Sequence, residues 1–182
     1  MNLEQLANLG EFIGAIAVIA SVIYLAIQIK QNTQSVKSST LATNTAIWTN
    51  MLIDLASDEK AEAYLNGAIG REDIEPKQLL QFVQISRAML VSFETQHHQY
   101  LTGALDKNIY LGYERACREQ MLVFPGFQMI WDITRNGFSP AFAELVDRII
   151  SEINEGESFH ITQQWQALAA QRKAGTRTPT DS

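Results

Sequence analysis

The chain has 182 residues and a net charge of −6, from 14 basic and 20 acidic side chains. This length suits one domain with a sizeable core, and the acidic balance argues against nucleic acid as a partner because like charges repel phosphate. Cys117 is the only cysteine, so an intrachain disulfide is excluded and a reducing compartment is favoured. Four prolines and ten glycines interrupt the chain sparsely, which favours helices.

The first distinctive element is an uncharged apolar stretch from Phe12 to Ile27. Extended to residues 9–29 it forms about 31 Å of helix, enough for a hydrocarbon core of about 30 Å. Because it is apolar on every side, the stretch predicts a transmembrane helix; a buried helix of a soluble protein is the alternative. A cleaved signal peptide fits less well, since no Lys or Arg precedes the stretch and no small-residue cleavage site follows it.

The charges around this span indicate its orientation. The first eleven residues contain no Lys or Arg, whereas Lys30 and Lys37 follow the span. By the positive-inside rule, the C-terminal part is expected in the cytoplasm. The lipid bilayer is therefore the first predicted partner, and the expected location is the inner (plasma) membrane, crossed once.

Small residues recur on one side of the predicted span. Gly10, Gly14, Ala17 and Ser21 follow a 4-3-4 spacing, which places them within roughly 60° of one another on a helix. A G-x-x-x-G pair such as Gly10 and Gly14 lets helix backbones approach closely in lipid. The stripe predicts a homo-oligomer or docking on a partner membrane helix. The alternative is that small residues are simply common in membrane helices.

Residues 30–46 form a polar region between the predicted anchor, residues 1–29, and the rest of the chain. Eleven of residues 31–46 are Asn, Gln, Ser or Thr, and none is Gly or Pro. The anchor helix can continue through this region as a stalk, although the low helix propensity means that it would need packing partners. A flexible tether is the alternative.

Residues 47–173 are expected to form an all-α domain, a bundle of five or six helices, and residues 174–182 a disordered tail. Prolines at first helical positions and glycines after last turns indicate the boundaries. The expected helices cover residues 47–56, 58–66, 76–102, 107–124, a short segment around Trp131, 140–155 and 162–173. In the longest of them, Phe82, Met89, Phe93 and His97 share one apolar face.

Several stretches resemble an uncharacterised family of short bacterial proteins. They are SVIYLAIQIKQNTQS at the membrane exit, FETQHHQYLTGALD, the Pro125-Gly126 break followed by Trp131, and FSPAFAELVD from Phe138 to Asp147. The chain departs from the family pattern where Tyr110 or Tyr113 stands for an expected Trp, and where Arg135 alone remains of the arginines around Trp131. The resemblance implies one N-terminal transmembrane helix and an all-helical C-terminal domain, and it implies no activity.

The longest predicted helix carries the only arrangement suggestive of chemistry. Glu94 and His97 form E-x-x-H, the spacing found in carboxylate-bridged di-metal bundles. The other E-x-x-H of the chain, Glu157 and His160, lies in a loop-like stretch and not on a predicted helix, so no metal site is predicted. His97 lies on the apolar face, so its ring is expected to be buried and bonded to Glu94, Tyr100 or a backbone carbonyl. With Trp131 these residues form a predicted polar node, which either fixes helix register or titrates as a sensor.

The sequence contains no phosphate-binding loop, H-E-x-x-H, C-x-x-C or G-x-S-x-G motif. Neither an enzyme nor a cofactor is therefore predicted. The leading hypothesis is a membrane-tethered helical interaction or scaffold protein that self-associates through its membrane helix. The alternative is a membrane-anchored ligand or pH sensor with a pocket around the polar node, for a ligand that the sequence does not identify. A metalloenzyme is the third class.

Overall fold

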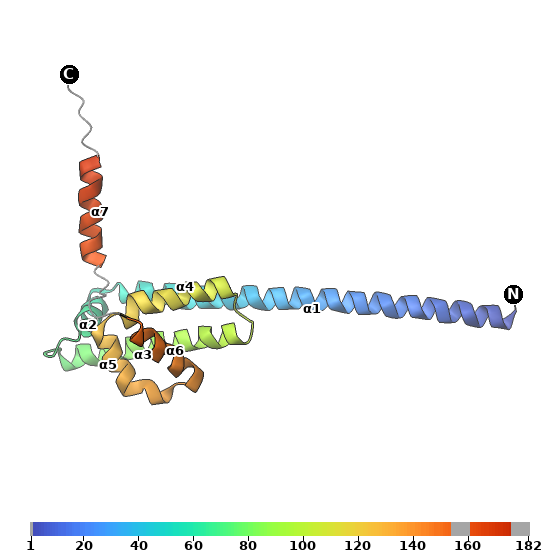
Figure 1. Ribbon diagram of the computed structural model, residues 1–182, viewed down its shortest axis with the longest axis horizontal. Coiled ribbons are helices and arrows are strands. Elements are labelled where there is room, and N and C mark those ends of the chain that lie inside the picture. Colours follow the sequence, from blue (N-terminus) through green and yellow to red (C-terminus); the bar gives the residue numbers. More distant parts are fainter. Residues whose placement is uncertain (1, 154–160, 176–182) are drawn as a thin grey trace, which may run out of the picture.

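A computed structural model describes residues 2–153 and 161–175, and this part of the chain is helical without any strand (Figure 1). Its α-helices are α1 (Leu3–Leu55), α2 (Asp58–Ala68), α3 (Pro76–Leu101), α4 (Lys107–Cys117), α5 (Pro125–Thr134), α6 (Pro140–Ser151) and α7 (Ile161–Gly175). A π turn, Arg118–Leu122, widens the end of α4, and a 3-10 turn, Arg135–Gly137, follows α5. The all-α prediction is confirmed.

The predicted bundle of five or six helices needs a small correction. Residues 47–55 are not a separate helix, because they form the end of α1. The hydrophobic core is built from α2 to α6, the π turn and this end of α1, and α7 contributes none of its described residues. Of the predicted tail, residues 174–175 belong to α7, and residues 176–182 lie outside the described part.

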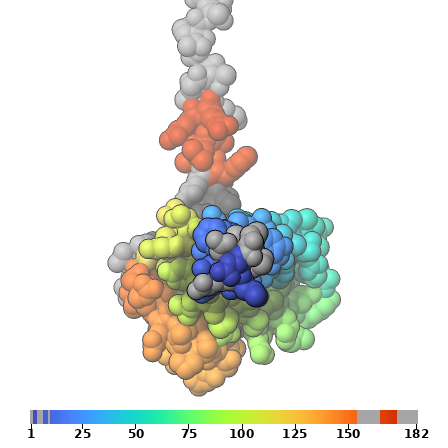
Figure 2. Space-filling view, turned by 90° about the vertical axis from the view of Figure 1, so that its right-hand side faces the viewer, coloured from blue at the N-terminus to red at the C-terminus, as the bar shows by residue number. Residues whose placement is uncertain are grey.

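α1 is a single helix of 53 residues, which corresponds to a length of about 80 Å. It runs without a break through residues 30–46, so this region is helical and not a coil in the structure. Residues 10–39 are exposed throughout, and this part stands clear of the bundle (Figure 1). Figure 2 looks along α1, with its blue N-terminal part in front of the other elements. Within the described residues, α1 is the one helix long and apolar enough to cross a membrane.

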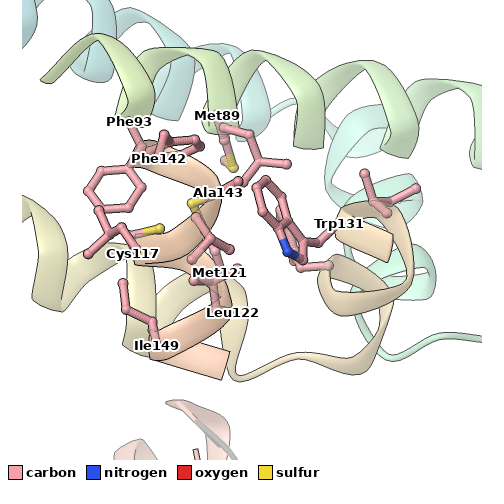
Figure 3. Packing of buried hydrophobic residues seen from close by; sticks show 14 of the residues in the cluster. Met89, Phe93, Cys117, Met121, Leu122, Trp131, Phe142, Ala143 and Ile149 are labelled. Atoms are coloured by element: carbon pink, nitrogen blue, oxygen red, sulfur yellow. The ribbon is translucent and has the colours of Figure 1, made fainter. Parts of the chain in front are cut away.

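The bundle closes around aromatic side chains. The rings of Phe82 and Phe127 meet edge to face at 5.2 Å, and those of Phe93 and Phe142 at 5.3 Å, a geometry that stabilises aromatic pairs beyond their burial. Figure 3 shows side chains from α3 to α6 and the π turn converging on one cluster, with Trp131 among them. The aromatic residues thus tie helices that are distant in sequence into one unit.

α2 and α5 cross at two glycines. A Cβ added to Gly126 would lie 1.8 Å from the carbonyl oxygen of Gly67, and one added to Gly67 would overlap the ring of Phe82. The sequence predicts only a break at Pro125-Gly126. The structure confirms the break, shows that α5 begins at Pro125, and adds the reason for the glycine, which is the close approach of the two backbones.

Candidate functional site

The predicted small-residue stripe lies on the open surface of α1. Gly10, Gly14, Ala17 and Ser21 are all exposed, and a Cβ added to either glycine would meet no atom within 4 Å. The hydroxyl of Ser21 donates to the carbonyl oxygen of Ala17 at 2.7 Å, so this polar group is satisfied within the helix. No described part of the chain covers the stripe.

Because α1 is unbroken, the same spacing continues far beyond Ser21. We call this line of residues the neutral row: Gly10, Gly14, Ala17, Ser21, Tyr24, Gln28, Gln31, Ser35, Ser38, Ala42, Thr45, Thr49 and Leu52. All of them are exposed and none is charged; Lys30 and Lys37 lie on the other half of the helix. A repeat that averages 3.5 residues is the period of a left-handed coiled-coil seam. The sequence predicts the stripe only as far as Ser21, because the low helix propensity of residues 30–46 leaves the conformation of the stalk open.

The bundle packs against α1 to one side of the neutral row. Asn44 is buried, and Trp48, Met51 and Leu55 pack against the core. On average these four residues lie roughly 100° around the helix from the row, and Trp48 and Leu55 are the two nearest to it. The bundle therefore leaves the whole row accessible, including its last residue, Leu52.

The predicted polar node is centred on a residue that sequence reasoning did not include. Nδ1 of His97 and the hydroxyl of Tyr110 form a hydrogen bond of 2.8 Å. The ring of Tyr100 stacks on that of Tyr110, with centroids 4.3 Å apart and planes 2° from parallel. The structure thus brings His97 and Tyr100 together through α4. Within the described part of the chain, no hydrogen bond joins this ring to Glu94 or to a backbone carbonyl.

The other two predicted members have partners elsewhere. Glu94 accepts a 2.7 Å hydrogen bond from the backbone N–H of Ser139, at the start of α6. Nε1 of Trp131 donates to Asp147 at 2.8 Å, and the ion pair of Asp147 with Arg135, aided by this bond, lowers the pKa of the carboxyl group. Glu94 and Trp131 therefore fix α6 against α3 and α5.

The electrostatics of His97 favour its neutral form. Burial lowers the pKa of His97 below its usual value, and burial together with nearby Glu114 raises the pKa of Tyr110. A neutral imidazole bonded to a neutral phenol is an arrangement that fixes helix register at neutral pH. Among the described residues, no three His, Cys, Asp or Glu side chains gather into a group able to hold a metal.

Two apolar grooves flank the end of α1. The first, which we call the Trp48 groove, has a volume of about 340 Å³, and its lining includes Trp48, Leu52, Leu55, Leu65, Gln120 and Phe124. The second, the Lys60 groove, has a volume of about 440 Å³, and its lining includes Met51, Asp54, Lys60, Leu80 and Ile85. An ion pair between Asp54 and Lys60 lies in the second groove, whereas the described lining of the first is uncharged.

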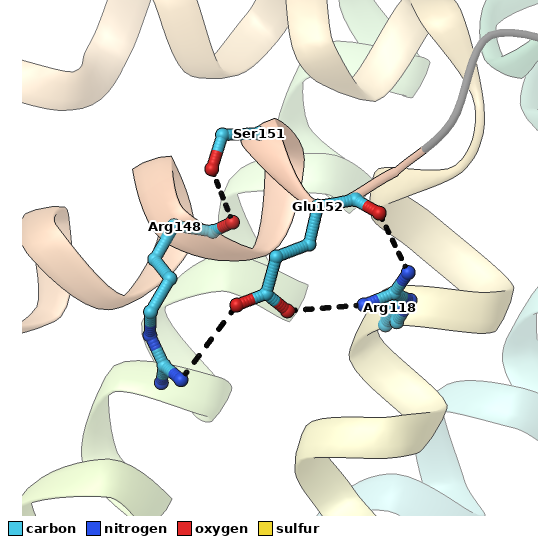
Figure 4. A network of polar contacts seen from close by, with 4 residues as sticks. All are labelled: Arg118, Arg148, Ser151 and Glu152. Atoms are coloured by element: carbon cyan, nitrogen blue, oxygen red, sulfur yellow. Dashed lines mark hydrogen bonds and ion pairs between the residues drawn. The ribbon is translucent and has the colours of Figure 1, made fainter.

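The wall of the Trp48 groove formed by the π turn is held by a polar network. Arg118 bonds the side chain of Glu152 at 3.2 Å and its backbone carbonyl at 2.9 Å, and Arg148 pairs with the same carboxylate at 4.0 Å (Figure 4). These contacts join the end of α6 to the π turn. They position Gln120 and Met121, which line the groove.

Comparison with known proteins adds no relative to this picture. No protein family matches the chain, no curated protein matches its sequence, and no solved structure matches its fold.

Proposed function

We propose that this chain is a membrane-tethered interaction protein that self-associates through α1. The observation that carries the proposal is the exposed, unbroken apolar part of α1, residues 12–29. Each Å² of apolar surface left in water is unfavourable by about 25 cal/mol, and no described part of the bundle covers this surface. A bilayer removes it from water along its full length.

The proposed orientation follows from the charges near the span. Lys30 and Lys37 follow it on the bundle side, and the first eleven residues carry no positive side chain. The positive-inside rule then favours a cytoplasmic bundle held at a plasma membrane. Membership of the family of short bacterial proteins that the chain resembles belongs to the same proposal.

Self-association is supported by the composition of the neutral row. Two copies anchored in one membrane enter from the same side, so their α1 helices run parallel and the same residues face each other across a two-fold axis. An uncharged row does not repel its own copy. Gly and Ala permit close backbone approach in lipid, and Gln, Ser and Thr both donate and accept hydrogen bonds in the stalk. Such packing also stabilises residues 30–39, which the bundle leaves unsupported.

The test compares two substitutions that add similar bulk to α1. Gly14→Ile places a branched side chain in the neutral row, and Ala26→Ile places the same side chain on the opposite side of the helix. We expect Gly14→Ile to weaken self-association in a two-hybrid assay for membrane helices, and Ala26→Ile to leave it unchanged. An unchanged signal for Gly14→Ile would show that the neutral row is not the surface through which the chain self-associates.

A ligand or pH sensor built around His97 has weaker support. The pKa of His97 is lowered by burial, which moves its titration away from neutral pH. The two grooves lie beside the end of α1 and have no His97, Tyr100 or Tyr110 in their described lining. We therefore assign this cluster a role in helix register and propose the interaction function.

A further inference from the structure

We infer that the Trp48 groove is the docking place for a second copy of this chain, which inserts Leu52 and Ile53 of its own α1. The contact between the copies would then run from the bilayer into the bundle as one interface. This inference rests on the proposed self-association through α1. The part of the second copy that reaches the bundle is the end of its α1.

We call Leu52 and Ile53 the aliphatic ridge. The chemistry of the groove suits these two side chains. Its described lining is uncharged and almost entirely apolar. Two of its residues stand at the rim with large exposed fractions, 52% for Leu52 on α1 and 64% for Leu65 on α2. Exposed aliphatic residues beside an open apolar groove mark an interaction surface more strongly than scattered single ones do.

The geometry connects this groove directly to the neutral row. Leu52 is at once the last residue of the row and a lining residue of the groove. Trp48 flanks the row on one side and lines the groove, whereas Ile53 flanks it on the other side and is 68% exposed. In a parallel pair of helices, residues on one flank of the seam face those on the opposite flank of the partner. The row thus sets Ile53 of one copy against Trp48 of the other.

Several observations favour a second copy over another occupant. Anchoring in one bilayer holds the same segment of each copy at the same height, which raises its effective concentration at the groove. The Lys60 groove is lined partly by residues on the side of α1 away from the row, such as Asp54, and contains an ion pair. The same aliphatic ridge and the same uncharged groove occur on every copy. One two-fold contact therefore covers both ridges and both grooves.

The test uses single cysteines in the full chain in native membranes, with buried Cys117 replaced by Ala. Ala17→Cys reports the row inside the span, Leu52→Cys reports the groove, and Asn50→Cys, an exposed position off the row, is the matched control. Under mild oxidation we expect disulfide-linked dimers with Ala17→Cys and Leu52→Cys and several-fold fewer with Asn50→Cys. If Leu52→Cys behaves like Asn50→Cys while Ala17→Cys links, the groove inference is wrong and the proposed function stands. If Ala17→Cys does not link, the proposed self-association fails, and the inference fails with it.

A second variant tests the groove without changing α1. Leu65→Glu puts a charge on the rim from α2, and we expect it to reduce Leu52→Cys dimers several-fold while Ala17→Cys dimers persist. Ile133→Glu, at an apolar residue of α5 that is 78% exposed and does not line the groove, should change neither. Unaltered Leu52→Cys linkage in Leu65→Glu would overturn the inference. So would a disulfide within one chain between Leu52→Cys and Trp165→Cys, because α7 of the same chain would then occupy the groove.

Discussion

The side-chain amide of Asn44 donates a 2.7 Å hydrogen bond to the side-chain carbonyl of Gln99, and this bond joins α1 to α3 across 55 positions of the chain. Asn44 is buried, and it lies where the free part of α1 meets the bundle. The bond fixes the height and rotation of α1 on α3. The bond therefore holds α1 so that the side carrying the neutral row faces away from the bundle.

Replacing Asn44 with Ala should destabilise the bundle by about 1–2 kcal/mol, because one hydrogen bond is lost and a small cavity remains. Chemical unfolding of the full chain in detergent, followed by tryptophan fluorescence, measures the change. Asn50→Ala, on the exposed side of the same helix, is the matched control and should be nearly neutral. Equal effects of the two substitutions would contradict a specific role for the bond.

Replacing Gln96 should stabilise the bundle, whereas replacing Asn44 should destabilise it. The side chain of Gln96 is fully buried in α3, and neither atom of its amide has a hydrogen-bond partner within the described chain. A buried polar group without a partner is unfavourable by about 1–3 kcal/mol, so Gln96→Met should raise the thermal midpoint of the bundle. A lowered midpoint would show that this amide makes a favourable interaction.

Gly126→Ala should be strongly destabilising, because its Cβ would lie 1.8 Å from the carbonyl oxygen of Gly67. Overpacking of this kind is unfavourable by about 1–3 kcal/mol, and backbone atoms yield less easily than side chains. Gly137→Ala is the control, since its Cβ would meet no atom within 4 Å. Comparable thermal midpoints for the two variants would refute the close crossing of α2 and α5.

The lowered pKa of His97 predicts that the folded bundle loses stability in acid. Burial is the main cause of the lowered pKa; Arg148 and His98 lower it further, while Glu114 and Glu94 oppose the shift. The unfolded chain, with a pKa near 6.5, then binds the proton more readily than the folded chain. The stability contributed by neutral His97 is complete above about pH 6.5 and is lost as the pH falls through the folded value.

His97→Gln should therefore flatten the loss of stability between about pH 7.5 and pH 5, whereas His98→Gln, at an exposed neighbour, should leave the loss intact. Thermal unfolding of the three proteins at both pH values measures the difference. An identical pH dependence in His97→Gln and the unchanged protein would show that another group titrates.

Local signals in the sequence were enough to predict where α3 and α6 begin. Pro76 and Pro140 stand at first helical positions as expected, because proline lacks the N–H that a helix start leaves unused. The apolar face of α3 is confirmed by the burial of Phe82, Met89 and Phe93. These features depend on residues within one or two turns of each other.

The partners across the fold were not predictable in this way. Tyr110 bonds His97 from α4, and Asp147 bonds Trp131 from α6. Both pairs depend on how the helices pack. Neither Tyr110 nor Asp147 belongs to a sequence pattern that would identify its partner. The continuity of α1 was also left open, since its Asn, Gln, Ser and Thr residues have low helix propensity and packing decides such cases.

Accessibility of single cysteines in native membranes tests the central claim, that α1 crosses a bilayer with the bundle in the cytoplasm. In a Cys117→Ala background, Val18→Cys lies within the span and Ser39→Cys lies in the stalk; both positions are exposed in the isolated chain. The account predicts that a membrane-impermeant maleimide labels Ser39→Cys only after the membrane is opened. It predicts that Val18→Cys stays unlabelled until detergent is added. Rapid labelling of Val18→Cys in sealed or opened membranes, or recovery of the chain in the soluble fraction, would contradict the account.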